Sequence, residues 1–298
     1  MVSTSGGSSV SGCNFTNTKT NGYGGGVYVF STNGGSSVNG CNFTNNTALG
    51  GGGVDISGVN CSVSGCSFTN NTASMNGGGI YINNNGSVVF NRFVNNTDNG
   101  TMVGNGVTCT DFCNVSSNWY GNNTPQNITN GVMKDYYQVE LSANQVFTRD
   151  LNKSASGIIP VLLGYKMCLN GSNNTGNIAN LPDFNATIKL NNITGLFRSD
   201  IALFRFSPFM MPGESVNVSA KNHWNDIINN HGNYTFSALA DNQQLNLNIT
   251  AERMNTSLSL IAANITYGDN INITATLTSG NGTRLTNKSI IFREFLLT

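Results

Sequence analysis

The sequence predicts an all-β protein, in which a parallel β-helix (a solenoid of about five coils) is followed by β-sandwich modules. Three observations lead to this prediction. The chain is rich in Asn and Gly, and only 9% of its residues are charged, a composition that disfavours helices. A segment of 25 to 28 residues recurs through the first half. The second half shows alternating apolar residues at the spacing of sandwich strands.

Composition also excludes several classes of function. The net charge is +0, with only 14 Lys and Arg in 298 residues, so the chain lacks the positive surface with which proteins hold nucleic acids or anionic membranes. No window of about 18 apolar residues occurs, so we expect no transmembrane helix. Hydrophobic residues make up 38% and include 16 Phe, which is enough apolar surface to form a core.

The repeat in the first half defines one coil of the solenoid. The segment Val10-Ser-Gly-Cys-Asn-Phe15 recurs at 38–43, 63–68 and 88–93, and a worn copy covers 115–120. Each earlier copy is followed by a Gly triplet, degraded in the fourth copy, and then by a second alternating strand. Two short strands per repeat, separated by Gly and Asn turns, are typical of a β-solenoid.

Coils that stack at roughly 4.8 Å place like residues on like. We therefore expect two inward-facing ladders, one aromatic and one of thiols, and a ladder of side-chain amides at a turn. The aromatic ladder comprises Phe15, Phe43, Phe68 and Phe93. The thiol ladder comprises Cys13, Cys41 and Cys66. The amide ladder comprises Asn17, Asn45, Asn70 and Asn95.

The repeats carry a family resemblance as well. The pattern Phe-Thr-Asn-Asn-Thr-Ala, followed by Gly-Gly-Gly-(Val/Ile)-Tyr, resembles the repeat of the chlamydial polymorphic outer-membrane proteins. It is more similar still to adhesin-like surface proteins of methanogenic archaea, which run from a right-handed parallel β-helix into immunoglobulin-like modules. Residues 118–125 (Asn-Trp-Tyr-Gly-Asn-Asn-Thr-Pro) resemble the closing coil of those helices. The resemblance implies a right-handed helix, an extracellular location at the cell surface and a role in cell adhesion.

We expect three domains. Residues 1–131 form the β-helix, and most of the charged residues follow it. Residues 132–253 predict an immunoglobulin-like β-sandwich, and residues 254–298 begin a second one that is incomplete. Because the chain begins inside a repeat and stops as a strand pattern begins, we interpret it as a fragment that lacks its export signal and its anchor.

A polysaccharide-active enzyme of the pectate-lyase type is the alternative for a β-helix, and its site needs clustered carboxylates. The helix offers Asp55, Asp98 and Asp111. By repeat register Asp55 lies between the inward Val54 and Ile56 and faces outward, while the other two lie on different arcs. No shared face results, so we expect neither an enzyme nor a catalytic residue.

Metal and cofactor sites are not expected either. His223, His231 and Asp226 could ligate zinc, but their spacing matches no standard site, and histidines in loops are the favoured interpretation. For the seven cysteines we favour free thiols, with Cys109 and Cys113 as the candidate disulfide if one exists.

Asn-x-Ser/Thr sequons are denser than composition predicts, and such sequons mark surface positions. N-glycosylation of an exported protein explains this density, and the alternative is a compositional bias from an AT-rich genome. The candidate sites are Asn45, Asn70, Asn95, Asn185, Asn217, Asn248, Asn264 and Asn272.

Two tyrosines are candidates for stacking on sugar rings. Tyr28 and Tyr81 share one outward register position two coils apart, with Asp55 between them. The sequence therefore predicts a non-catalytic adhesin-like protein, whose β-helix binds glycans or surface proteins of host or neighbouring cells, and whose sandwiches act as spacers. A purely structural envelope protein is the third hypothesis.

Overall fold

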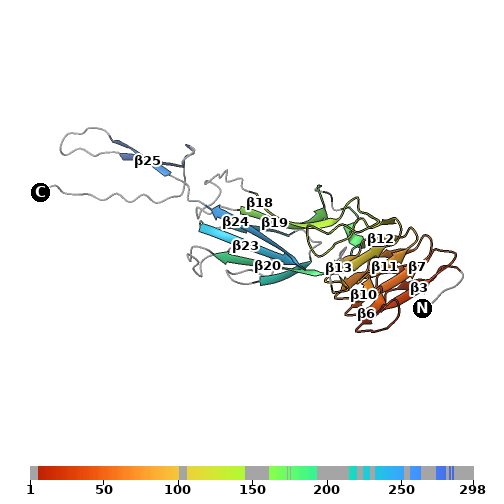
Figure 1. The fold of residues 1–298 in the computed structure, drawn as a ribbon. Coiled ribbons are helices and arrows are strands. Elements are labelled where there is room, and N and C mark those ends of the chain that lie inside the picture. The colour runs from red at the N-terminus through yellow and green to blue at the C-terminus, as the bar shows by residue number, and fades with distance from the viewer. Residues whose placement is uncertain are drawn as a thin grey trace, which may run out of the picture.

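The computed structural model describes residues 6–100, 106–144, 161–172, 174, 176–192, 215–219, 224–228, 232–251, 256–262, 273–279, 282 and 284. This described part is all-β, and its one helical element is the 3-10 helix η3 (Ile178–Asn180). A parallel β-solenoid of about four turns comes first, and antiparallel sheets follow it (Figure 1). The predicted fold class is confirmed. The worn fifth copy of the repeat adds only part of a further coil.

The solenoid is built from four parallel sheets, rather than from the two strands per repeat that the sequence pattern predicts. The first sheet stacks β1 (Ser9–Ser11), β4 (Ser37–Asn39), β8 (Ser62–Ser64), β12 (Ser87–Val89), β16 (Cys113–Asn114) and β17 (Gly131–Val132). The second stacks β2 (Asn14–Thr16), β5 (Asn42–Thr44), β9 (Ser67–Thr69) and β13 (Arg92–Val94). The third stacks β6 (Thr47–Gly50), β10 (Thr72–Asn76) and β14 (Thr97–Asp98). The fourth stacks β3 (Val27–Phe30), β7 (Val54–Ser57), β11 (Ile80–Asn83) and β15 (Val107–Cys109).

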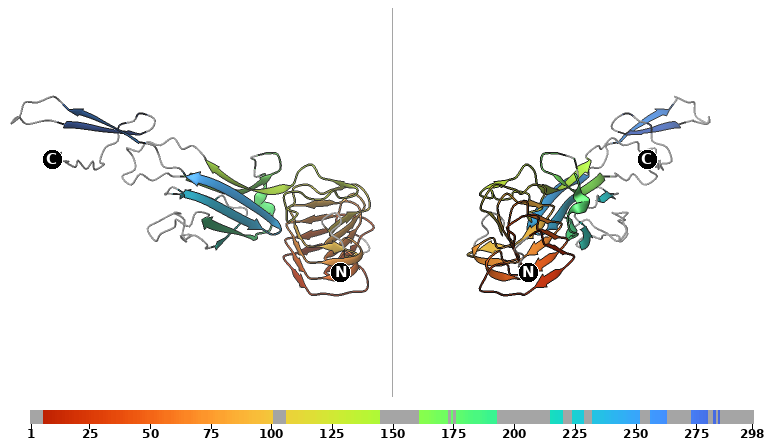
Figure 2. Two further views of the ribbon diagram at one scale, coloured as in Figure 1. Left: turned by 60° about the vertical axis from the view of Figure 1, so that its left-hand side comes forward. Right: turned by 90° about the vertical axis from the view of Figure 1, so that its right-hand side faces the viewer.

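A left-handed residue splits the first predicted strand of each repeat into two. Gly12, Gly40 and Gly65 have φ angles of 64°, 59° and 63°, and Phe90 takes the same conformation in the fourth coil, with φ of 58°. A residue in this region turns the chain out of the extended conformation. The segment therefore becomes two short strands in adjacent sheets, and the stacked coils have an additional corner (Figure 2, left).

The predicted aromatic ladder is confirmed. The rings of Phe15, Phe43, Phe68 and Phe93 stack in parallel, with successive centroids 5.1, 4.8 and 5.1 Å apart. Tyr120, from the worn copy of the repeat, extends the ladder at 5.5 Å from Phe93. A column of buried aliphatic side chains completes the core beside it, formed by Val27, Val54, Ile80 and Val107.

The predicted amide ladder is wrong by one residue. Asn45 is exposed and left-handed, with φ of 56°, so the chain turns there and the next side chain enters the interior. The ladder consists of Asn46, Asn71 and Asn96, which are buried. The backbone N–H of Asn46 donates to Oδ1 of Asn71 at 3.0 Å, and that of Asn71 donates to Oδ1 of Asn96 at 3.0 Å. Buried amides thus supply the hydrogen bonds that the backbone lacks at this corner.

The thiol ladder serves the same purpose at another corner. Cys41 and Cys66 are buried, whereas Cys13 in the first coil is exposed. The backbone N–H of Cys41 donates to Sγ of Cys66 at 3.4 Å. In the next coil Asn91 takes this position, and its Oδ1 accepts from the N–H of Cys66 at 2.9 Å. The sulfur atoms are therefore acceptors as well as apolar core atoms.

Two antiparallel sheets follow the solenoid. The three-stranded sheet contains β18 (Tyr137–Asn144), β19 (Val161–Leu169) and β22 (Trp224–Ile228). The four-stranded sheet contains β20 (Asn185–Asn192), β21 (Ser215–Ser219), β23 (Gly232–Ala240) and β24 (Gln243–Ala251). A separate antiparallel pair contains β25 (Thr256–Ala262) and β26 (Ile273–Ser279).

The first two antiparallel sheets pack beside the later coils of the solenoid (Figures 1 and 2). Trp119, in the worn repeat, is fully buried there, and its ring stacks on Phe184 with centroids 6.0 Å apart. The last coil of the solenoid is thereby covered by the module that follows it.

Candidate functional site

The outer surface of the fourth solenoid sheet carries an aligned row of polar and aromatic residues. Strand register places Tyr28 of β3 beside Asp55 of β7, Asp55 beside Tyr81 of β11, and Tyr81 beside Thr108 of β15. The residues on either side of each point into the core, as Val54 and Ile56 do around Asp55. The row predicted from Tyr28 and Tyr81 therefore lies on one face of the solenoid.

A third tyrosine joins this row from outside the strands. Tyr23 is 51% exposed, and its ring lies 6.2 Å from that of Tyr28, with an interplanar angle of 27°. Sequence reasoning missed Tyr23 because its segment carries no repeat motif. An isolated β-bridge pairs Tyr23 with Gly50 of the next coil. Only an alignment of the loop around Tyr23 with the segment around Gly50 would have placed Tyr23 beside this row. We call the group Tyr23, Tyr28, Asp55 and Tyr81 the tyrosine face.

Asp55 lies in the middle of the tyrosine face and is buried. It points away from the core, as predicted, but neighbouring groups cover it, so that only 2% of the residue is exposed. No described residue donates a hydrogen bond to its carboxyl. Burial without such donors penalises the charged form and raises the pKa of Asp55 to about 7.

Tyr81 responds to the same environment. Its partial burial raises the pKa of the phenol, and the nearby Asp55 and Tyr23 raise it further. The phenol therefore stays neutral and can both donate and accept hydrogen bonds. The tyrosine face thus combines three aromatic rings with one carboxyl group whose ionisation changes near neutral pH.

Asp98 lies in β14 of the third sheet, on a different arc from Asp55 as predicted, but its side chain reaches the row. Asp98 is buried, and its carboxylate accepts hydrogen bonds from the backbone N–H of Gly77 at 2.9 Å, from that of Gly78, and from Oγ1 of Thr108 at 3.1 Å. Thr108 lies next to Tyr81 in the row. Asp98 therefore reaches the edge of the same face, but its oxygens already hold the glycine turn. Asp111 is exposed in the segment between β15 and β16 and does not join them.

The seven cysteines comprise one disulfide and five free thiols. Cys109 and Cys113 are joined by a disulfide. Five other cysteines are free thiols, namely Cys13, Cys41, Cys61, Cys66 and Cys168.

The candidate glycosylation sites lie both on the solenoid and on the strands that follow it. Asn45, Asn70 and Asn95 are exposed at the left-handed corner of three successive coils, and Asn185 and Asn248 are exposed in β20 and β24. Asn217 lies in β21. Asn264 and Asn272 lie outside the described residues, as do His223 and His231, whereas Asp226 lies in β22.

Within the described ranges, no cluster of three His, Cys, Asp or Glu residues could hold a metal ion. No helix among these residues is long and apolar enough to cross a membrane. Comparisons with known protein families, with curated proteins and with solved structures return no match.

Proposed function

We propose that this chain belongs to an extracellular, adhesin-like protein and binds glycans without cleaving them. The observation that carries this proposal is the tyrosine face, in which one exposed ring (Tyr23) and two half-buried rings (Tyr28 and Tyr81) surround one carboxyl group. Aromatic rings offer apolar surface to the C–H face of a sugar, and the tyrosine hydroxyl groups offer hydrogen-bond partners to its hydroxyl groups.

The architecture supports display at a cell surface. The rigid solenoid presents the tyrosine face along its side, and antiparallel sheets of three and four strands follow it. We propose that these sheets serve as an immunoglobulin-like spacer. Many weak contacts, multiplied over many copies, give firm adhesion. The repeat motif favours an archaeal surface protein, and the exposed Asn-x-Thr corners favour a glycosylated one.

A β-helix enzyme is the second candidate, and Asp55 is the specific observation in its favour. A carboxyl group with a pKa of about 7 can act as a general acid at neutral pH. Glycoside hydrolysis needs a second carboxylate that is available to the substrate. The carboxylate of Asp98 accepts from Thr108 of the row, but it is bound to the Gly77–Gly78 turn, which favours binding over catalysis.

The test uses the whole purified chain on immobilised glycans of host, plant and microbial origin, with analysis of the eluate for released sugar. We expect retention without release, and a loss of at least tenfold in affinity when Tyr28→Ala and Tyr81→Ala are combined. Phe112→Ala is the matched control, because Phe112 is 74% exposed but lies off the tyrosine face. Released sugar that disappears in Asp55→Asn would establish the enzyme, and no retention on any glycan would favour a purely structural protein.

A further inference from the structure

A separate hollow of about 410 Å³ lies where the solenoid meets the following sheets. Its volume falls within the range of small-molecule sites, roughly 300–1,000 Å³. Three parts of the chain form its wall: the last complete coils, the loop after Tyr120, and the turn between β23 and β24. The lining residues are Phe93, Asn95, Asn96, Tyr120, Asn122, Thr124, Gln126 and Asn242.

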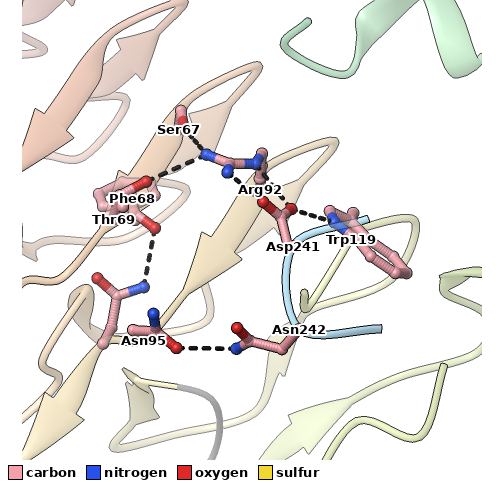
Figure 3. Close-up of polar contacts among 9 residues, drawn as sticks. Ser67, Phe68, Thr69, Arg92, Asn95, Trp119, Asp241 and Asn242 are labelled. Atoms are coloured by element: carbon pink, nitrogen blue, oxygen red, sulfur yellow. Dashed lines mark hydrogen bonds and ion pairs between the residues drawn. The ribbon is translucent and has the colours of Figure 1, made fainter. Parts of the chain in front are cut away.

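The turn that closes this hollow is firmly anchored. Asp241, next to the lining residue Asn242, forms an ion pair with Arg92 of β13 (Figure 3). Its Oδ2 also accepts from Nε1 of Trp119 at 2.7 Å. The guanidinium of Arg92 lies 5.1 Å from the ring centroid of Phe184. These contacts fix the turn against the solenoid, so the wall of the hollow is preformed.

Further hydrogen bonds cross the same junction. The backbone N–H of Asn242 donates to the carbonyl oxygen of Gly121 at 3.0 Å. Oε1 of Gln243 accepts from the backbone N–H of Asn123 at 2.8 Å. The loop after the last coil is thus held in place by the sandwich, and both regions are needed to form the hollow.

The lining is polar but contains no charged side chain. The nearby Arg92 is already paired with Asp241, so the hollow offers no attraction to an anion. Five lining side chains carry amides and Thr124 carries a hydroxyl group. Phe93 and Tyr120 contribute rings, and the hydroxyl group of Tyr120 donates to the carbonyl oxygen of Val115. Amides and aromatic rings together match a ligand that has many hydroxyl groups, apolar C–H faces and no charge.

Specific polar groups in the lining are available to such a ligand. Oδ1 of Asn95 accepts from Nδ2 of Asn242 at 2.8 Å (Figure 3). This bond leaves Nδ2 of Asn95 as a donor and Oδ1 of Asn242 as an acceptor, and within the described residues neither atom has another partner. The hydroxyl group of Thr124 likewise has no partner there. A donor and an acceptor side by side suit adjacent hydroxyl groups of one sugar ring.

We propose that this hollow is a binding site for a neutral saccharide of one or two rings. The site is distinct from the tyrosine face, because its residues come from other sheets and from the module after the solenoid. It requires only that the sandwich be docked, and it does not depend on the glycan binding proposed for the side of the solenoid.

The test uses the whole chain, produced in a host without N-glycosylation, and saturation-transfer NMR with four neutral probes: cellobiose, maltose, lactose and N,N′-diacetylchitobiose. Digalacturonic acid serves as the anionic comparison. We expect saturation transfer to at least one neutral probe, and titration calorimetry then measures its affinity. Thr124→Val and Asn242→Ala should each lower the affinity for this probe at least tenfold. Thr129→Val is an exposed control in the same loop and should leave the affinity unchanged.

The outcomes separate the two proposed sites. If Thr124→Val loses binding of the probe and the double variant of Tyr28 and Tyr81 retains it, the hollow is the binding site, even if the tyrosine face binds nothing. Loss only in the tyrosine variant, no transfer to any neutral probe, or equal binding of the anionic probe would overturn the proposal. Thermal melts establish that Asn242→Ala is folded, and Thr124→Val removes a single exposed hydroxyl group, so the test does not rest on a variant that unfolds.

Discussion

Arg92 and Asp241 are 149 residues apart in the sequence and form a two-point ion pair between the solenoid and the sandwich. Their side chains are only 15% and 8% exposed. Arg92 additionally donates to Ser67 at 2.9 Å and to Thr69 at 3.1 Å, while Asp241 accepts from Trp119. This network joins three successive coils of the solenoid to the turn between β23 and β24, so the two regions should unfold together.

Asp241→Ala should destabilise the protein by about 2 kcal/mol, because it leaves the guanidinium of Arg92 and the N–H of Trp119 without their acceptor. The cost stays below that of a fully buried broken pair, since Arg92 keeps Ser67 and Thr69. Urea unfolding followed by tryptophan fluorescence measures the change. The control is Glu140→Ala, which breaks the more exposed pair with Lys166 and should cost less than about 1 kcal/mol. Equal costs for the two variants would contradict this account.

A second prediction concerns the stability of the left-handed corner at Gly40. Its φ is 59°, and an added Cβ would meet no atom within 4 Å, so Gly40→Ala tests conformation without crowding. We expect a loss of about 1 kcal/mol, which is the cost of a Cβ in the left-handed region. Gly22→Ala is the matched control, because Gly22 has no positive φ and its Cβ would make only an ordinary contact with Thr20 at 3.6 Å. If Gly40→Ala is as stable as Gly22→Ala, the corner is not held in this conformation.

Asp55 should make stability depend on pH with a definite sign. Its pKa rises from 3.8 to about 7 on folding, so the folded state binds the proton more tightly than the unfolded state. This contribution is fully present below about pH 4 and is lost as the pH rises to about 7. A rise of three pKa units corresponds to up to about 4 kcal/mol.

Asp55→Asn removes the titration and keeps the shape of the side chain. Its unfolding free energy should therefore exceed that of the natural protein at pH 8, and the difference should shrink as the pH falls toward 4. Chemical denaturation at several pH values gives both curves. A constant difference between them would show that the pKa of Asp55 is the same in the folded and unfolded states.

The repeat spacing was sufficient to predict the solenoid, its aromatic ladder and the alignment of Tyr28 with Tyr81. Register gives the direction of a side chain but not what covers it, so the burial of Asp55 could not be foreseen. The shift of the amide ladder from Asn45 to Asn46 follows from one left-handed residue, which the repeat does not distinguish from its neighbours. The pairing of Arg92 with Asp241 has no local signal at all, because it depends on how two separate regions dock.

The same docking predicts unequal glycosylation of three otherwise matched sequons. Asn45, Asn70 and Asn95 share the Asn-Asn-Thr sequence and φ angles of 56°, 55° and 54°. Only Asn95 among them is bonded to Asn242 and lines the hollow at the junction. Attachment of a glycan requires that the transferase enzyme reach Nδ2 of the asparagine. At Asn95 this atom lies at a hollow that can admit a small saccharide, whereas the neighbouring turn at Asn242 hinders the much larger enzyme.

In a host that performs N-glycosylation, glycopeptide mass spectrometry should therefore find lower occupancy at Asn95 than at Asn45 and Asn70. The Asn242→Ala variant removes the contact, and the glycan occupancy at Asn95 should then approach that of the other two sites. Equal occupancy at all three sites in the natural sequence would mean that glycan transfer precedes docking of the sandwich. Lower occupancy at Asn95 that Asn242→Ala does not relieve would assign the restriction to the loop at Asn122 and Thr124 instead.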